Sequence, residues 1–268
     1  MRVIIRYMNK DRIKSGFKTL LAEIFVDKYN CLVCDDELPQ PTHYGLCQEC
    51  FDKLEFIKDR ICKKCGRLQL NEADFCLTCQ QHERHFDFAR SCVVYNDIAK
   101  EMVRGIKFGH KKYYGKYFSQ YLIDRYKEVY ENIAIDCIIP VPLTKERKKE
   151  RGYNQAEIMA KPLAEALGVP IDNKLIIKTI SNKEQAKLTG KEREENVIGV
   201  YSLAENADVK GKNYLIVDDV MTTGSTLSEI AKILKKAKAN EIFALTFAST
   251  RYKLQGESLV YEEDLYEN

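Results

Sequence analysis

The chain has 268 residues, which is enough for one large domain or for one domain with a small module. An apolar fraction of 45% allows an ordinary hydrophobic core, and a net charge of +3 identifies no partner by itself. No apolar run approaches the ~20 residues of a membrane-spanning helix, and the first residues lack the uninterrupted apolar stretch of a signal peptide. We therefore expect a cytoplasmic protein.

Residues 1–30 are predicted to form an amphipathic N-terminal extension. Its first half is basic, and Phe17, Leu20, Leu21 and Ile24 then follow helical spacing along one face. Such a helix packs either on its own protein or on the inner face of a membrane, and the sequence leaves both possibilities open.

Residues 31–84 contain eight of the ten cysteines, as four C-x-x-C pairs separated by 12, 11 and 10 residues. The pairs are Cys31/Cys34, Cys47/Cys50, Cys62/Cys65 and Cys76/Cys79. Two such turns hold one tetrahedral Zn²⁺ between them, so the spacing predicts a double zinc ribbon with two structural zinc ions. Disulfides are the alternative, which a reducing cytoplasm disfavours. We expect sequential pairing, with an interleaved cross-brace as the other arrangement.

A second domain is predicted over residues 85–250. It begins with a strand at 91–95 and helices at 98–108 and 113–130. The segment joining the two helices alternates cations with aromatic rings, which is how single-strand binders combine charge for the backbone with ring faces for bases. The candidate residues for single-stranded DNA are Lys107, Lys111, Lys112 and Tyr113. The alternative is that these rings belong to the core.

A buried strand at 134–141 is followed by a very basic loop at 145–155. A loop at this place lies at the crevice where open α/β sheets bind ligands. The candidate residues for contacts with a diphosphate are Lys145, Arg147 and Arg151. A helix at 156–167 comes next, and we expect Pro162 to kink or divide it.

A strand at 174–179 precedes a polar stretch without clear periodicity, which we expect to be a mobile loop that covers the site. Arg193 and Asn196 are its candidates to reach the ligand. Residues 242–248 predict a further strand. The chain continues into an acidic tail at 251–268, and residues 256–268 of it are expected to be frayed.

The most informative stretch is YLIVDDVMTTGSTL, from Tyr214 to Leu227. It reads as a buried strand, two carboxylates (Asp218 and Asp219), a hydroxyl-rich loop and the start of a helix. The carboxylates suit vicinal sugar hydroxyls and can place Mg²⁺ through water. The free N–H groups of a helix start attract a phosphate. The loop residues expected to bind this phosphate are Thr222, Thr223, Gly224, Ser225 and Thr226. The pattern thus predicts a site for a phosphorylated ribose.

This stretch resembles the phosphoribosyl-diphosphate (PRPP) motif of type I phosphoribosyltransferases. With the paired zinc knuckles, an IKF segment at 106–108 and PVPL…RGYNQAE at 140–157, the order of features resembles the ComF family from about residue 31 to residue 249. The resemblance implies a mostly parallel α/β sheet with flanking helices, of the type I phosphoribosyltransferase kind, behind a zinc-ribbon module. It also implies a role in natural transformation, with incoming single-stranded DNA, a DNA-translocating ATPase and a recombination mediator as partners.

Three hypotheses follow for the function. The first is a DNA-uptake protein that uses a PRPP or ribose-5-phosphate site for binding, with Mg²⁺ as the companion ion of PRPP. The second is an active phosphoribosyltransferase with an unknown acceptor. The third is a regulator that senses PRPP or a nucleotide. A glutamine-dependent version of the enzyme needs an N-terminal cysteine, whereas here the first cysteine is Cys31.

Overall fold

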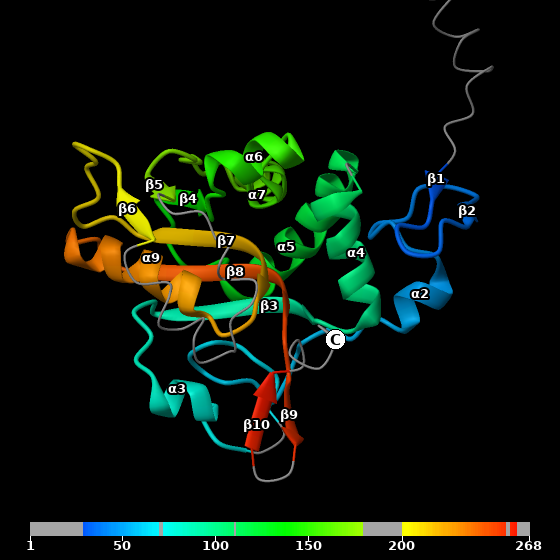
Figure 1. The fold of residues 1–268 in the computed structure, drawn as a ribbon, viewed down its shortest axis with the longest axis horizontal. Helices are drawn as coiled ribbons and strands as arrows, with labels where there is room; N and C mark the ends of the chain where they lie inside the picture. The colour runs from blue at the N-terminus through cyan, green and yellow to red at the C-terminus, as the bar shows by residue number, and fades with distance from the viewer. Residues whose placement is uncertain (1–28, 70–71, 110, 179–199, 256–257, 262–268) are drawn as a thin grey trace, which may run out of the picture.

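The computed structural model describes residues 29–69, 72–109, 111–178, 200–255 and 258–261 (Figure 1). Nearly all of the expected N-terminal extension and the predicted covering loop with Arg193 and Asn196 lie outside these residues. Within the described part of the chain, no helix combines the length and the apolar character that crossing a bilayer requires.

A four-stranded parallel sheet forms the centre of the molecule, with the order β3-β8-β7-β4. Its strands are β3 (Phe88–Val94), β4 (Cys137–Pro140), β7 (Tyr214–Met221) and β8 (Ile242–Ser249). Strand β8 is buried along its whole length, as expected for a parallel strand covered on both faces. The mostly parallel α/β sheet expected from the resemblance is confirmed.

Helices cover both faces of this sheet (Figure 1). Helices α4 (Asp97–Phe108), α5 (Gly115–Val129) and α7 (Gln155–Leu167) share one hydrophobic core with the sheet. Helix α9 (Ser225–Lys236) packs in a second core on the other face. A short 3-10 turn, η1 (Lys112–Tyr114), leads directly into α5.

The basic segment after β4 is a helix, α6 (Lys145–Arg151), so the prediction of a loop was wrong. Thr144 caps its start by accepting from the Arg147 N–H, and the cations gather in the last turn, where the helix dipole favours them. Gly152 ends it in the left-handed conformation.

Pro162 does not divide the following helix. Helix α7 runs unbroken from Gln155 to Leu167, although a proline inside a helix removes one backbone hydrogen bond. Six buried residues along α7, among them Met159 and Leu163, anchor the helix to the core, and this packing holds it together across the proline.

Two small antiparallel pairs lie outside the main sheet. Strand β5 (Ile176–Lys178) pairs with β6 (Tyr201–Leu203), and β9 (Tyr252–Gln255) pairs with β10 (Ser258–Tyr261). The second pair corrects the expectation of a frayed tail, because the described part of that tail forms a regular ladder.

The cysteine-rich segment is divided between the two faces of the sheet. Its first half contains β1 (Tyr29–Asn30), β2 (Glu37–Leu38) and α2 (Gln48–Asp52), and Cys31 and Cys50 belong to the core with α4 and α5. Its second half contains α3 (Leu77–Gln81), and Cys62, Cys65 and Cys76 belong to the core with α9. The two cysteine clusters are therefore built into two different cores.

The chain between the two clusters runs along the outer edge of β3. Ile57 donates its N–H to the Cys92 carbonyl at 2.9 Å, and Val94 donates to the Glu55 carbonyl at 2.8 Å. Phe56 and Val93 form an antiparallel bridge. This segment covers an edge that would otherwise present unpaired backbone groups.

Candidate ligand site and zinc centres

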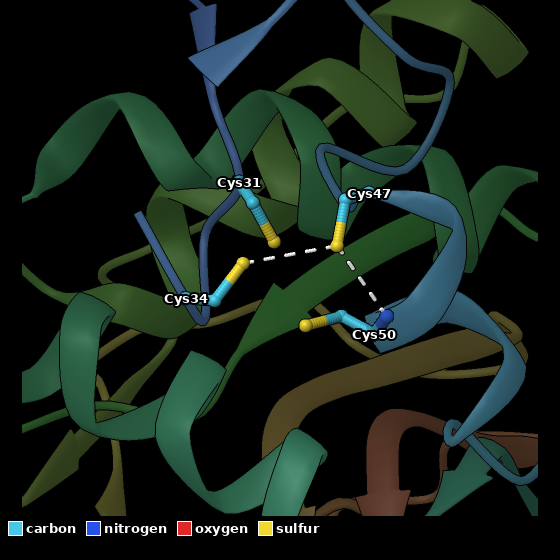
Figure 2. A group of neighbouring side chains, drawn as sticks. All are labelled: Cys31, Cys34, Cys47 and Cys50. Atoms are coloured by element: carbon cyan, nitrogen blue, oxygen red, sulfur yellow. Dashed lines mark hydrogen bonds between the residues drawn. The ribbon is translucent and has the colours of Figure 1, made fainter. Parts of the chain in front are cut away.

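The first zinc centre is formed by Cys31, Cys34, Cys47 and Cys50, whose side chains point toward a common centre (Figure 2). The Cys34 and Cys47 sulfur atoms lie 3.7 Å apart, and the four sulfurs lie within 4.8 Å of one another. Zn–S bonds of about 2.3 Å in a tetrahedron separate the sulfurs by about 3.8 Å. The four thiols therefore fit one Zn²⁺.

The second centre repeats this arrangement with Cys62, Cys65, Cys76 and Cys79. The Cys65 and Cys76 sulfur atoms lie 3.6 Å apart, and the backbone N–H groups of Cys65 and Cys76 both point at the Cys62 sulfur. Such N–H donors stabilise a thiolate, which is the form that binds zinc. The predicted sequential pairing is confirmed, and the alternative of an interleaved cross-brace is wrong.

The acidic pair lies near the carboxyl end of β7, which continues through both residues to Met221. The Asp219 side chain is 5% exposed, whereas Asp218 is only partly buried. The carboxyl ends of parallel strands are where open α/β sheets bind their ligands. The strand is longer than the sequence suggested, because Asp218 and Val220 pair with Thr246 and Ala248 of β8.

Two side chains from distant elements hold Asp219. Lys107, at the end of α4, places its ammonium nitrogen 2.5 Å from one carboxylate oxygen. Gln155, the first residue of α7, donates to the other oxygen at 3.3 Å. Arg151 in turn donates to the Gln155 side-chain carbonyl. The acidic pair is thus built into a network that joins α4, α6, α7 and β7.

The two carboxyls differ in acidity. Burial, and next the charge of Asp219, raises the pKa of Asp218 well above its usual range. Burial acts on Asp219 too, but Lys107 and the hydrogen bonds from Asp218, Lys107 and Gln155 outweigh it and lower the pKa of Asp219. Of the two carboxyls, Asp219 therefore ionises more readily, and its negative charge disfavours a second charge on Asp218.

The loop after β7 leaves the start of α9 open. Gly224 is the N-cap residue, in the left-handed conformation with φ of +80°, and it has no side chain to cap the helix, but the Thr223 hydroxyl accepts from the Ser225 N–H at 3.2 Å. The hydroxyls of Thr223 and Ser225 lie 2.7 Å apart and bond each other, while Thr222 and Thr226 are partly buried. The N–H groups of Thr226 and Leu227, in the first turn of this helix, suit an anion.

Further cations surround the acidic pair. Burial lowers the pKa of Lys178, at the end of β5, while the nearby Asp218 opposes this shift. The Lys178 ammonium lies 5.3 Å from the ring centre of Tyr201, and burial raises the pKa of that phenol. Of the three residues expected at a diphosphate, Arg151 is buried close to Asp219, whereas Lys145 and Arg147 are exposed on α6.

The residues expected to bind single-stranded DNA fall into two places. Lys107 lies in the acidic network, as described above. Lys112 and Tyr113 are exposed on η1, and Tyr113 is 56% exposed. Lys111 lies 2.9 Å from the Tyr114 hydroxyl and 3.4 Å from an Asp35 carboxylate oxygen, so it links η1 to the first zinc ribbon.

Comparisons with known proteins agree with this architecture. A double zinc ribbon domain matches residues 23–80, and a phosphoribosyl transferase domain matches residues 153–265. Competence protein ComFC of Bacillus subtilis (strain 168) is 30% identical over 82% of this chain and 95% of its own length. The chain belongs to the ComF family. Another relative, DNA utilization protein YhgH of Escherichia coli (strain K12), is 26% identical over 76% of this chain and 90% of its own.

Among solved structures, a purine phosphoribosyltransferase from Pyrococcus horikoshii Ot3 is 26% identical, over 49% of this chain and 70% of that one, with a TM-score of 0.33. That score is too low to carry an argument. The phosphoribosyltransferase-like fold of this ComF chain rests on the family model and on the parallel sheet.

Sequence reasoning missed several residues of the candidate site. Gln155 lies in the RGYNQAE segment and is the first residue of α7, which follows β4 and α6. A polar residue at the start of a helix after a strand of the sheet was the signal that could have identified it. Lys178 and Tyr201 belong to the small β5–β6 pair, which brings together residues on either side of the predicted covering loop. Arg67, which donates to the Thr222 carbonyl, gave no signal at all.

Proposed function

We propose that this ComF-family protein acts in natural competence, binding a ribose-5-phosphate or PRPP-type ligand with Mg²⁺ and handling single-stranded DNA in the cytoplasm. The family membership supports the competence role. The PRPP-type ligand and the DNA are the finer part of the proposal, and each has its own support.

One observation carries the ligand assignment: a carboxylate pair, with Asp219 buried and Asp218 partly buried, lies near the end of β7, shortly before the start of α9. Asp218 and Asp219 suit the ribose hydroxyls, and the N–H groups around Ser225 suit the 5′-phosphate. Arg151 and Lys178 supply the positive charge that a diphosphate needs. A diphosphate at this place also gives Mg²⁺ the oxygen ligands it prefers.

The exposed ring surface next to α4 supports the DNA assignment. Phe108 is 65% exposed and Tyr113 is 56% exposed, although large apolar side chains are usually buried. The exposed Lys112 and Lys116 lie beside these rings in the sequence. Exposed aromatic faces between cations are typical of sequence-tolerant single-strand binding. A DNA-translocating ATPase and a recombination mediator, the partners that the resemblance implies, would pass and receive the strand at this surface.

Calorimetry with ribose-5-phosphate, and with PRPP and Mg²⁺, tests the ligand site. The double variant Asp218→Asn/Asp219→Asn should lose binding while it keeps two zinc ions per chain. Asp208→Asn serves as the matched control, because Asp208 is an exposed carboxylate that pairs with Lys212. Unchanged binding in the double variant would remove the ligand from this site.

The second candidate function is an active phosphoribosyltransferase, which the same residues favour because in the proposed site they would contact both the ribose and the leaving diphosphate. Pyrophosphate release distinguishes the two functions. Binding of PRPP without release, with and without single-stranded DNA, supports a ligand-binding DNA protein. Release that depends on an added acceptor supports the enzyme.

A further inference from the structure

A cation of the second zinc ribbon reaches the phosphate loop of the phosphoribosyltransferase-like domain. Arg67 is 1% exposed, and its guanidinium donates a hydrogen bond to the backbone carbonyl of Thr222. The two residues are 155 positions apart in the chain. Thr222 is the first residue of the loop whose N–H groups are the candidate phosphate donors. Arg67 therefore contacts the backbone of the proposed site.

The second zinc centre fixes the backbone that carries Arg67. Cys62 accepts from the Gly66 N–H at 2.8 Å, and its own N–H donates to the Arg67 carbonyl at 2.9 Å. These bonds close the knuckle around Cys62 and Cys65, two of the four ligands of that centre. A zinc ion held by these cysteines would therefore constrain the turn from which the Arg67 side chain leaves.

The knuckle is also seated tightly on the sheet. A Cβ added at Gly66 would lie 2.4 Å from the Ala89 carbonyl oxygen of β3, so only glycine fits this contact. The Ala89 N–H donates to the Lys64 carbonyl at 2.8 Å. Directly after the ribbon, the His85 N–H lies 3.2 Å from the Ser228 hydroxyl in the first turn of α9. The ribbon thus contacts the strand, the loop and the helix start together.

We propose that Arg67 is a positioning residue for the phosphate loop, and that the second zinc centre, through Arg67, sets the affinity of the site for a phosphorylated ribose. This inference rests on the proposed ligand site. The guanidinium orients the Thr222 peptide, and a charged donor to a backbone carbonyl in a buried place holds that orientation strongly. The N–H groups that follow are then presented to the phosphate before it binds, which lowers the entropy cost of binding.

The first test compares ligand affinity in two variants. Arg67→Met keeps much of the length of the side chain but removes the donors, and it should weaken ribose-5-phosphate binding by roughly 5- to 150-fold, the usual range of coupling between sites. Lys63→Ala is the control from the same knuckle, because Lys63 is exposed and forms an ion pair with Asp74 at the surface. Equal affinities of wild type and Arg67→Met, with both zinc ions retained, would overturn the positioning role.

The second test uses the wild-type chain, so that it does not depend on how well a variant folds. Coupling between two binding sites is reciprocal, so a saturating phosphorylated ribose must tighten zinc binding at the second centre by the factor by which that zinc tightens ribose binding. Competition with a buffered chelator should show one of the two zinc ions held more tightly in the presence of ribose-5-phosphate. Equal chelator curves with and without bound ligand would refute the coupling.

The two proposals fail in different ways. If the wild-type protein shows no heat with ribose-5-phosphate or with PRPP and Mg²⁺, the proposed function itself fails. If wild type binds and the ligand leaves the zinc affinity unchanged, only the coupling of the second zinc centre to the site fails, and if Arg67→Met binds as tightly as wild type, the positioning role of Arg67 fails. Amide hydrogen exchange over residues 222–228 tests the role of Arg67 without added ribose-5-phosphate or PRPP. Arg67→Met should speed exchange in this segment, whereas Lys63→Ala should leave it unchanged.

Discussion

Replacing Lys107 with methionine is expected to destabilise the protein in a pH-dependent way. Lys107 lies 2.5 Å from Asp219, and their side chains are 27% and 5% exposed. The substitution keeps most of the aliphatic stem in the core but leaves the buried carboxylate without its cation. Breaking a buried pair from one side usually costs about 3–5 kcal/mol, because the remaining charge is left without compensation.

The variant can avoid a buried unpaired charge by protonating Asp219, so the free energy of that protonation is an upper limit to the cost of the substitution. Taking a carboxyl with an ordinary pKa of about 3.9 to its neutral form at pH 7 requires about 4 kcal/mol, and at pH 5 it requires about 1.5 kcal/mol. We therefore expect a loss of about 2–4 kcal/mol at pH 7 and no more than about 1.5 kcal/mol at pH 5.

The sign of this pH dependence follows from the two folded states. In the wild type, Lys107 helps to lower the pKa of Asp219, so this carboxylate stabilises the fold above its ordinary pKa and the stabilisation is lost as the pH falls. In the variant the folded pKa of Asp219 rises, so stability is lost as the pH rises through it. The difference between the two proteins must widen from pH 4 toward pH 7.

Urea unfolding at pH 7 and pH 5, with the same free zinc in every sample, measures this difference. The zinc contribution is common to both proteins and cancels in the comparison. Arg104→Met is the control on the same helix, because Arg104 is 62% exposed and its pair with Glu101 should contribute about 0–1 kcal/mol. A Lys107→Met penalty that is the same at both pH values would refute the reasoning.

Three further predictions follow from the structure. Gly66 has a positive φ and contacts Ala89, so Gly66→Ala should lower the free energy of unfolding, measured with heat or urea, by about 2–5 kcal/mol. Gly168 has a positive φ but open space around it, so Gly168→Ala should lower that free energy by only about 1–2 kcal/mol. Tyr113→Ala should weaken single-stranded DNA binding in fluorescence anisotropy by about 1–3 kcal/mol without changing its salt dependence, while Lys112→Ala should flatten that dependence; equal salt slopes would contradict the assignment. Exhaustive chelation should release two zinc ions per chain with loss of cooperative unfolding, and a stoichiometry of one would exclude the paired centres.

Local sequence patterns were enough to predict the main elements of the fold. The apolar residues of β7 and β8 read as buried strands, and the cysteine spacing gave the correct partners of both zinc centres. These features succeed because strand burial and metal knuckles depend on residues that are close together in the chain.

The contacts that shape the candidate site were not predictable in this way. The aromatic neighbours of Lys107 indicate a DNA surface, yet Lys107 pairs with Asp219, which is 112 residues away by their numbers. Arg67 is one of several cations of the ribbon, and burial at 1% distinguishes it from the exposed ones. Such pairings depend on how the elements dock, which no periodicity or spacing encodes. The helix α6 was missed for a local reason, because a run of charged residues carries no apolar stripe.

The division of the cysteine-rich segment between two faces of the sheet has a consequence for how the chain is made. The zinc-binding segment leaves the ribosome early, whereas its buried partners on β7 and α9 are synthesised more than a hundred residues later. At about 5–20 residues per second, the interval between Arg67 and Thr222 is on the order of 10–30 s. Metal loading can therefore precede the docking of the ribbons, and a shortened chain that begins after Cys79 would expose apolar surface on both faces of the sheet.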